Sequence, residues 1–240
     1  MLSSAVSSKM LRSMAEKEGF HHEETLTGFK WMGNKSLSLV EQGYVAPYAF
    51  EEAIGYMFGD IVRDKDGVAA TIVFLSLVQE ISKRRQTVYQ LLTELYERSV
   101  SIMEILIVRY GYFASQNSYV RCEDPAIMTN IFYKIRHQNS SVSYIQNFGE
   151  YRVTRIKDIS LGYDSQKDSA PNDRSVSPSA EMITFELNNS TVMTLRGSGT
   201  EPKLKYYIES KGKSMVEAKS KAEAVEKALL SVLRTLGLNL

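Results

Sequence analysis

The sequence predicts an α/β domain followed by an α+β domain. In the first third, short apolar runs alternate with segments of helical spacing and with glycine-containing turns, which is typical of an α/β unit. The last part holds several short alternating runs and closes with a long amphipathic segment, an order typical of an α+β unit. Hydrophobic residues make up 43% of the chain and charged residues 24%, which suits packed domains rather than a disordered chain.

The first domain is predicted over residues 1–115. A helix from Lys9 to Glu18 should end at Gly19, and Val45–Phe50 is an apolar strand candidate. Val68–Ile81 is apolar on nearly every face, which predicts a buried helix.

The join between the domains is predicted near residues 112–120. Before it, Thr87 can cap a further helix that runs to Arg98. An apolar, β-prone run, Ser99–Arg109, follows that helix directly. Taken by itself, this run could continue the helix and bury more surface.

The second domain is predicted over residues 116–240. A helix is expected over Ala126–Arg136. Four alternating runs predict strands: Tyr151–Ile156, Met182–Leu187, Thr191–Leu195 and Lys203–Glu209. Asn188–Ser190 should turn a hairpin between the second and third strands, and Asp164–Ala180 should be a surface loop. The last helix is expected over Met215–Leu236.

Charge and cysteine content exclude several classes of function. Lys and Arg number 29 and Asp and Glu 28, so a nucleic-acid partner is not expected, because phosphate neutralisation needs a basic excess. No stretch approaches the roughly 18–20 apolar residues of a membrane helix, so no membrane partner is expected. A single cysteine, Cys122, excludes an intrachain disulfide framework and a Cys-rich metal site. A reducing, cytoplasmic location is expected.

The strongest local signal for chemistry is the segment Arg196–Tyr207, which reads RGSGTEPKLKYY. Two glycines allow close backbone approach to a ligand, two hydroxyls can donate hydrogen bonds, and three cations add charge. These residues are Gly197 and Gly199, Ser198 and Thr200, and Arg196, Lys203 and Lys205. The residues alone favour a phosphate-binding loop, and a solvated hairpin turn stays the alternative.

Three segments in the same order resemble one family. The stretch R-x-S-G-T-E-P-K from Arg196 resembles the C-terminal phosphate-binding loop of the α-D-phosphohexomutase superfamily. Phe50–Ala70, FEEAIGYMFGDIVRDKDGVAA, is similar to its sugar-recognition loop, and Thr25–Lys35, TLTGFKWMGNK, to its T-G-x-K segment. The amino-acid sequences of these segments are most similar to the eukaryotic branch of phosphopentomutase and phosphoglucomutase-2.

The resemblance implies a fold and an activity. It implies domain three, a phosphoglucomutase-type mixed sheet with helices on both faces. Domain four would follow, an antiparallel sheet with helices on one face, like that of the TATA-box-binding protein. The implied reaction interconverts a sugar 1-phosphate and a 5- or 6-phosphate of glucose, ribose or deoxyribose through a bisphosphate. The sugar phosphate is the expected partner, and the sugar bisphosphate the expected intermediate and activator.

The resemblance also implies roles for individual residues. Those that would grip the substrate phosphate are Arg196, Ser198, Gly199, Thr200 and Lys205. Those that would contact the sugar are Glu51, Thr27 and Gly28. Those that would lie near the reacting phosphate are Lys65, Lys9 and Arg63. Taken alone, Glu51 and Lys65 would more often be solvated surface charges. Ala53 stands where relatives usually have serine, which removes one hydroxyl contact.

Two loops of the family do not occur in this sequence. They are the S-H-N-P-like phosphoserine loop and the D-G-D-x-D-like loop that holds Mg²⁺. We therefore assign no catalytic or metal residue here, and expect Mg²⁺ and the N-terminal domains as partners supplied elsewhere in a full-length enzyme. Residues 99–109 fall where relatives have none, so they are an expected insertion with an aggregation risk. A C-terminal fragment inactive alone is expected; a non-catalytic sugar-phosphate-binding remnant is the alternative.

Overall fold

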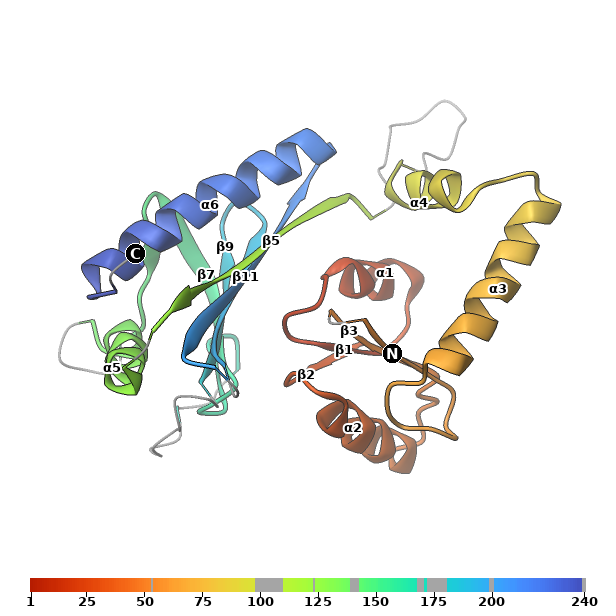
Figure 1. Cartoon of the computed structure of the whole chain (residues 1–240), viewed down its shortest axis with the longest axis horizontal. Helices are drawn as coiled ribbons and strands as arrows, with labels where there is room; N and C mark the ends of the chain where they lie inside the picture. Colours follow the sequence, from red (N-terminus) through yellow and green to blue (C-terminus); the bar gives the residue numbers. More distant parts are fainter. Residues whose placement is uncertain are drawn as a thin grey trace. The chain divides into compact units, whose positions relative to one another are not determined.

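The protein is described by a computed structural model (Figure 1). The structure describes residues 1–52, 54–97, 110–122, 124–138, 143–167, 171, 181–198 and 201–238. Contacts between residues divide the chain into two compact units, Met1–Tyr112 and Phe113–Leu240; the boundary predicted from the sequence lies between residues 115 and 116. Within the described residues, no helix is both long enough and apolar enough to span a bilayer.

Unit 1 is built on a mixed four-stranded sheet in the order β2-β1-β3-β4. The strands are β1 (Leu2–Ser4), β2 (Glu23–Thr25), β3 (Tyr48–Glu51) and β4 (Gly55–Phe58). Strand β1 runs parallel to β2 and β3, and β3 and β4 form an antiparallel hairpin. The helices α1 (Met10–Glu18) and α2 (Phe29–Glu41) flank this sheet (Figure 1).

The core of unit 1 joins the sheet to α2. Its buried residues are Leu2, Phe29, Met32, Leu39, Ala49 and Met57. The predicted end of α1 is confirmed, because Gly19 has a φ of 77° and its N–H donates to the Ala15 carbonyl over 2.9 Å. Glycine adopts this left-handed conformation without the steric penalty of a side chain.

Helix α3 (Gly67–Lys83) confirms the helix predicted from the apolar run but not its burial. The Asp66 side chain caps it by accepting from the Val68 and Ala69 amides. Among its described side chains Ile81 is the buried one, while Phe74 is 51% exposed. An apolar sequence favours burial, but burial also needs other elements to pack against the helix. Helix α3 contacts β4 and α4 (Val88–Glu97) along part of its surface.

Helix α4 begins as predicted, because the Thr87 hydroxyl accepts from the Gln90 amide over 3.1 Å. The run Ser99–Arg109 lies outside the described residues. The division between the two units, between Tyr112 and Phe113, falls within the predicted join at residues 112–120. These residues belong to strand β5 (Tyr112–Arg121), which pairs with another strand at the edge of a sheet. This stretch lacks the regular alternation that marks a half-buried strand.

Unit 2 is built on a sheet in the order β5-β11-β10-β9-β7-β6, with β8 paired to β7. The remaining strands are β6 (Asn147–Phe148), β7 (Tyr151–Asp158), β8 (Tyr163–Asp164), β9 (Met182–Leu187), β10 (Thr191–Gly197) and β11 (Lys203–Gly212). The predicted hairpin is confirmed, because β9 and β10 pair antiparallel across Asn188–Ser190. Of the predicted surface loop, residues 168–170 and 172–180 lie outside the described residues.

Helices α5 (Pro125–Arg136) and α6 (Met215–Thr235) share one core with the sheet (Figure 1). Fully buried members include Ile131 of α5, Leu229 of α6 and Leu195 of β10. Ser214 caps α6 by accepting from the Glu217 amide over 3.2 Å, as the sequence spacing predicts. The core therefore fixes one face of β10 and β11 and leaves the alternate side chains facing away from it.

Candidate functional site

The turn between β10 and β11 brings together two predicted phosphate ligands. Arg196 is paired in register with Lys205, and on its other side with Met182 of β9. Directly paired residues project from the same face of a sheet, so both cations lie on the face that alternates with core residues Leu195 and Leu204. The register thus places Arg196 and Lys205 at directly opposed positions on that face.

Ser198 adds a hydroxyl directly after β10. It is 8% exposed, and its Oγ has no hydrogen-bond partner among the described residues. Buried polar atoms usually have a partner, because leaving one unsatisfied costs about 1–3 kcal/mol. Gly199 and Thr200, the next two predicted ligands, lie outside the described residues.

Backbone hydrogen bonds fix both sides of this turn. The Gly197 amide donates to the Glu181 carbonyl over 3.0 Å, and the Ser198 amide donates to the Lys203 carbonyl over 3.0 Å. The Cys122 amide donates to the Pro202 carbonyl over 2.8 Å, which ties the turn to the end of β5. The described part of the turn is therefore anchored by two neighbouring strands as well as by its own hairpin.

Arg121 belongs to the same positive region, and sequence analysis missed it. The pKa of Glu201 is lowered first by a hydrogen bond from Lys203, then by the charges of Lys203, Lys205 and Arg121. Arg121 therefore acts electrostatically at this turn, although it is distant in sequence. Its position could not be inferred, because the stretch that carries it showed no strand pattern.

Unit 1 gathers the residues predicted to contact the sugar. Glu51, at the end of β3, accepts a hydrogen bond through Oε2 from the Gly28 amide over 3.0 Å. Gly28 has a φ of 106° and immediately precedes α2. A carboxylate at a helix N-terminus is stabilised by the helix dipole, so this contact orients Glu51. Thr27 is half-buried beside them.

Gly55 is a second residue that sequence analysis missed. A Cβ at this position would lie 2.8 Å from Cγ of Glu51 and 3.0 Å from Cγ of Lys65. The absence of a side chain at Gly55 therefore lets Glu51 and Lys65 pack next to each other. The glycine in the sequence EEAIGY was the feature from which this close packing could have been predicted.

The structure places Lys65 beside this glycine but in an exposed position. Its Nζ lies 3.0 Å from Oδ1 of Asp64 and 5.1 Å from the ring centre of Phe29. The Lys65 amide also donates to Asp64, and this contact is the main reason that the pKa of Asp64 is lowered. An exposed ammonium of this kind can turn toward an anion without breaking a buried contact.

Lys9 and Arg63 make contacts within unit 1. Lys9 is buried, and its Nζ donates to the Ala5 carbonyl over 2.8 Å and to Oε1 of Glu24 over 2.7 Å. The Arg63 guanidinium donates to the Ser36 hydroxyl of α2. The structure does not group either with Glu51, and their role toward a phosphate stays a prediction.

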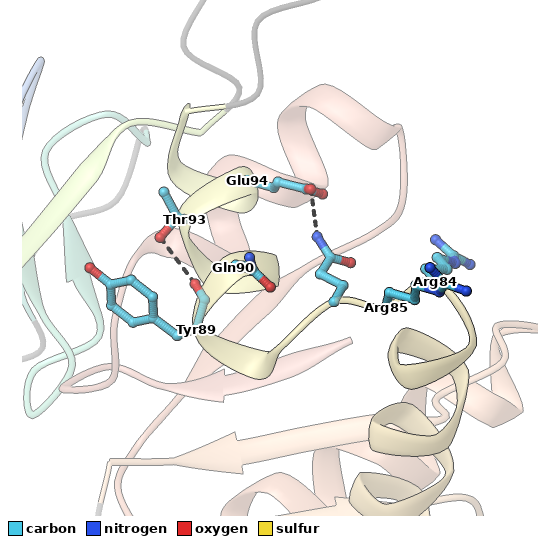
Figure 2. Close-up of a pocket in the computed structure, with 7 residues that line it drawn as sticks. Arg84, Arg85, Tyr89, Gln90, Thr93 and Glu94 are labelled. Carbon is cyan, nitrogen blue, oxygen red and sulfur yellow. Dashed lines mark hydrogen bonds between the residues drawn. The ribbon is translucent and has the colours of Figure 1, made fainter.

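A separate depression of about 630 Å³ lies where α3 meets α4 (Figure 2). Its lining residues are Arg84, Arg85, Gln86, Tyr89, Gln90, Thr93 and Glu94. The Gln86 amide donates to Glu94, and the Thr93 hydroxyl donates to the Tyr89 carbonyl. None of the site residues predicted from the sequence lines this depression.

The described side chains do not form a metal site. Within the described ranges, no group of three or more His, Cys, Asp or Glu side chains could hold a metal ion. These residues therefore do not fit the Mg²⁺ that the family resemblance implies.

Residues 1–99 match the family model of phosphoglucomutase/phosphomannomutase, alpha/beta/alpha domain III. Over 232 residues the chain is 44% identical to the "Probable phosphoribomutase" of Schizosaccharomyces pombe, covering 96% of this chain and 38% of that relative. This chain belongs to the phosphohexomutase superfamily. Within that superfamily it is 43% identical to human "Phosphopentomutase" and 42% identical to human "Glucose 1,6-bisphosphate synthase", each over 87% of this chain and 32% of the relative.

The fold agrees with this phosphohexomutase assignment. The crystal structure of a putative phosphomannomutase from Thermus thermophilus superposes with a TM-score of 0.53 at 11% identity, covering 96% of this chain and 36% of that chain. An identity this low supports the fold alone. The chain spans only about a third of the length of the curated relatives it matches.

Proposed function

We propose that this chain supplies the sugar-recognition and phosphate-binding parts of a sugar-phosphate mutase. The reaction would interconvert a sugar 1-phosphate with its 5- or 6-phosphate through a bisphosphate. The names of the relatives support this proposal, since they include a phosphoribomutase, a phosphopentomutase and a glucose 1,6-bisphosphate synthase at 42–44% identity.

The observation that carries the proposal is the buried Ser198 hydroxyl. Its Oγ has no partner among the described residues. Ser198 is two residues after Arg196, which stands opposite Lys205. A phosphate dianion would accept from the hydroxyl and would relieve the repulsion between the two cations. The arginine fork can bind two phosphate oxygens at once, while lysine acts as a point charge.

Glu51 is the proposed sugar contact. The Gly28 amide holds Oε2 over 3.0 Å, which leaves Oε1 able to accept hydrogen bonds from sugar hydroxyls. A carboxylate can accept from two neighbouring hydroxyls and so fixes the orientation of the ring. Lys65, which packs with Glu51 over Gly55, would add a cation on the same side.

In this proposal the turn after β10 binds the phosphate that does not react. Phosphoryl transfer also needs a phosphate donor and a cation that neutralises the developing charge. We propose that a phosphoserine and Mg²⁺ held outside this chain supply them, so the chain alone would bind substrate without turnover. A non-catalytic sugar-phosphate-binding protein is the alternative, favoured by the lack of both loops in the sequence.

The architecture of unit 2 fits this role. We propose that it has the topology of the TATA-box-binding protein, because α5 and α6 share one core with a largely antiparallel sheet. In such an arrangement the helices cover one face, so the side chains of Arg196 and Lys205 are left to the other face.

Thermal melting of the 240-residue chain tests the binding proposal. Ribose 5-phosphate and glucose 6-phosphate should raise the midpoint by several degrees, and unphosphorylated ribose should not, because a ligand that binds only the folded state stabilises it. The shift should vanish in Arg196→Ala and persist in Arg152→Ala, an exposed arginine on β7. Equal midpoints with and without phosphorylated sugar would contradict the proposal.

An activity assay separates the mutase fragment from its alternative. Conversion of ribose 5-phosphate to ribose 1-phosphate is expected to be absent with the chain alone, and turnover would contradict the fragment interpretation. Serine and aspartate loops in frame upstream of this coding sequence would support the mutase, and a stop codon directly upstream would support the binding protein.

A further inference from the structure

A buried ionic network lies beside the phosphate-binding turn. Arg136, the last residue of α5, donates through Nε to Oδ2 of Asp158 over 2.7 Å. Its Nη1 donates to Oε1 of Glu181 over 3.0 Å, and its Nη2 donates to both carboxylates. One guanidinium thus joins the end of β7 to the residue that precedes β9.

The network is removed from solvent. Arg136 is 7% exposed, Glu181 4% and Asp158 0%. Burial acts to lower the pKa of Arg136, but its hydrogen bonds to the two carboxylates outweigh this effect and raise the pKa. Tyr144 completes the set by donating to Oδ2 of Asp158 over 3.0 Å and stacking on Tyr163.

Stability alone is a weak reason for such a network. Buried ion pairs gain little over well-packed apolar side chains, because removing each charge from water offsets most of their attraction. The property that a planar fork does provide is a fixed geometry between the groups that it joins. The Arg136 fork therefore fixes the positions of Asp158 and Glu181 relative to the end of α5.

Glu181 connects the network to the phosphate-binding turn. Its carboxylate binds Arg136, while its backbone carbonyl accepts from the Gly197 amide over 3.0 Å. The next residue, Met182, is paired in register with Arg196. Two hydrogen bonds with Ser160 also hold Met182, the shorter at 2.7 Å. Gly197 lies between Arg196 and Ser198, so a shift of Glu181 would move both proposed phosphate ligands.

We propose that Arg136 is a positioning residue for phosphate binding, acting through Glu181 on the turn that carries Arg196 and Ser198. This inference rests on the proposed function. A turn already held in its bound geometry has less freedom to lose when the ligand arrives, so it binds more tightly. Arg136 itself is buried and donates to Asp158 and Glu181, so its proposed effect on the phosphate is indirect.

The test compares affinity with stability. Ribose 5-phosphate is titrated by calorimetry into the chain and into Arg136→Met, at a temperature where circular dichroism shows each protein to be folded. We expect Arg136→Met to bind about tenfold more weakly. Val225→Ala, a cavity variant in the buried face of α6, should lower the melting midpoint yet keep its affinity within about twofold. If both variants lose affinity alike, general destabilisation explains the loss and the inference is wrong.

A second readout reports on the turn itself. Hydrogen exchange at the Gly197 amide should be faster in Arg136→Met than in Val225→Ala of similar stability, because its acceptor is no longer fixed. If Arg136→Met fails to fold, the affinity and stability of Glu181→Gln are compared with those of Val225→Ala in its place. This variant keeps the backbone carbonyl of residue 181 and loses the charge. Wild-type affinity in the folded variants would overturn the role of Arg136 while leaving the proposed function intact. No binding by the wild type, or equal binding by Arg196→Ala, would overturn both.

Discussion

Arg196 on β10 stands directly opposite Lys205 on β11, in register. Like charges at directly opposed positions destabilise a pair of strands by a few tenths of a kcal/mol to about 1 kcal/mol. The arrangement becomes favourable when an anion lies between the two side chains. Two cations at directly opposed positions are therefore suited to hold a phosphate.

Replacing Lys205 by glutamine should separate these two effects. Without ligand, the free energy of unfolding should rise by a few tenths of a kcal/mol, because the repulsion from Arg196 is removed. The affinity for ribose 5-phosphate should fall about tenfold, because one charged contact is lost. Chemical denaturation and titration calorimetry measure the two quantities. Lys219→Gln, at an exposed position on α6, should change neither; a less stable Lys205→Gln protein that binds normally would contradict this account.

Ser198→Ala should increase stability while weakening binding. The Ser198 hydroxyl is buried and has no partner among the described residues, so its removal should raise the free energy of unfolding by about 1 kcal/mol. Ser160→Ala is the matched contrast, because Ser160 is similarly buried but bonded to Met182, and it should lower stability by a similar amount. Urea denaturation of the two variants gives the comparison, and changes of the same sign would refute it.

Gly55→Ala should disturb the sugar side of the site. A methyl group would approach Phe29, Glu51 and Lys65 within 2.6–3.0 Å, so these side chains must move, at about 1–3 kcal/mol of stability. Gly67→Ala provides the control, since a Cβ at this first residue of α3 meets nothing within 4 Å and alanine favours the helix by up to about 1 kcal/mol. Two variants of equal stability would show that a methyl group at residue 55 is accommodated without cost and would contradict this prediction.

Acidification should destabilise unit 1 through His22. Burial lowers the pKa of His22 to about 4, from an ordinary value near 6.5. Between these values the unfolded chain binds a proton that the folded chain does not, so stability is complete above pH 6.5 and falls as the pH drops toward 4. His22→Gln should flatten the fall in melting midpoint between pH 6.5 and pH 4. An unchanged pH profile in this variant would rule out His22 as its source.

Regular patterns in the sequence were sufficient to predict much of the secondary structure of unit 2. The alternation in Met182–Leu187 predicted β9 to the residue, and the capping residue Ser214 marked the start of α6. Each of these signals is local, because side-chain alternation and helix capping involve residues close together in the chain. The turn that carries Arg196 could be placed for the same reason, since it lies between two such strands.

Contacts between distant residues could not be predicted in this way. Nothing local shows that Lys9 pairs with Glu24, that Glu51 binds the Gly28 amide, or that Glu181 supports Gly197. The exposure of Phe74 was missed for a related reason, because periodicity describes one helix and not the surfaces around it. Long-range pairing depends on topology, which is a property of the whole sheet.

The most direct test of phosphate binding at this turn is a nuclear magnetic resonance titration of the isotope-labelled chain with ribose 5-phosphate. The amide signals of Gly197, Ser198 and Lys203 should shift together and saturate, and Arg196→Ala should abolish these shifts. Shifts confined to the depression around Arg84 and Arg85 (Figure 2), or no shifts at saturating ligand, would contradict the claim that the turn between β10 and β11 binds a sugar phosphate.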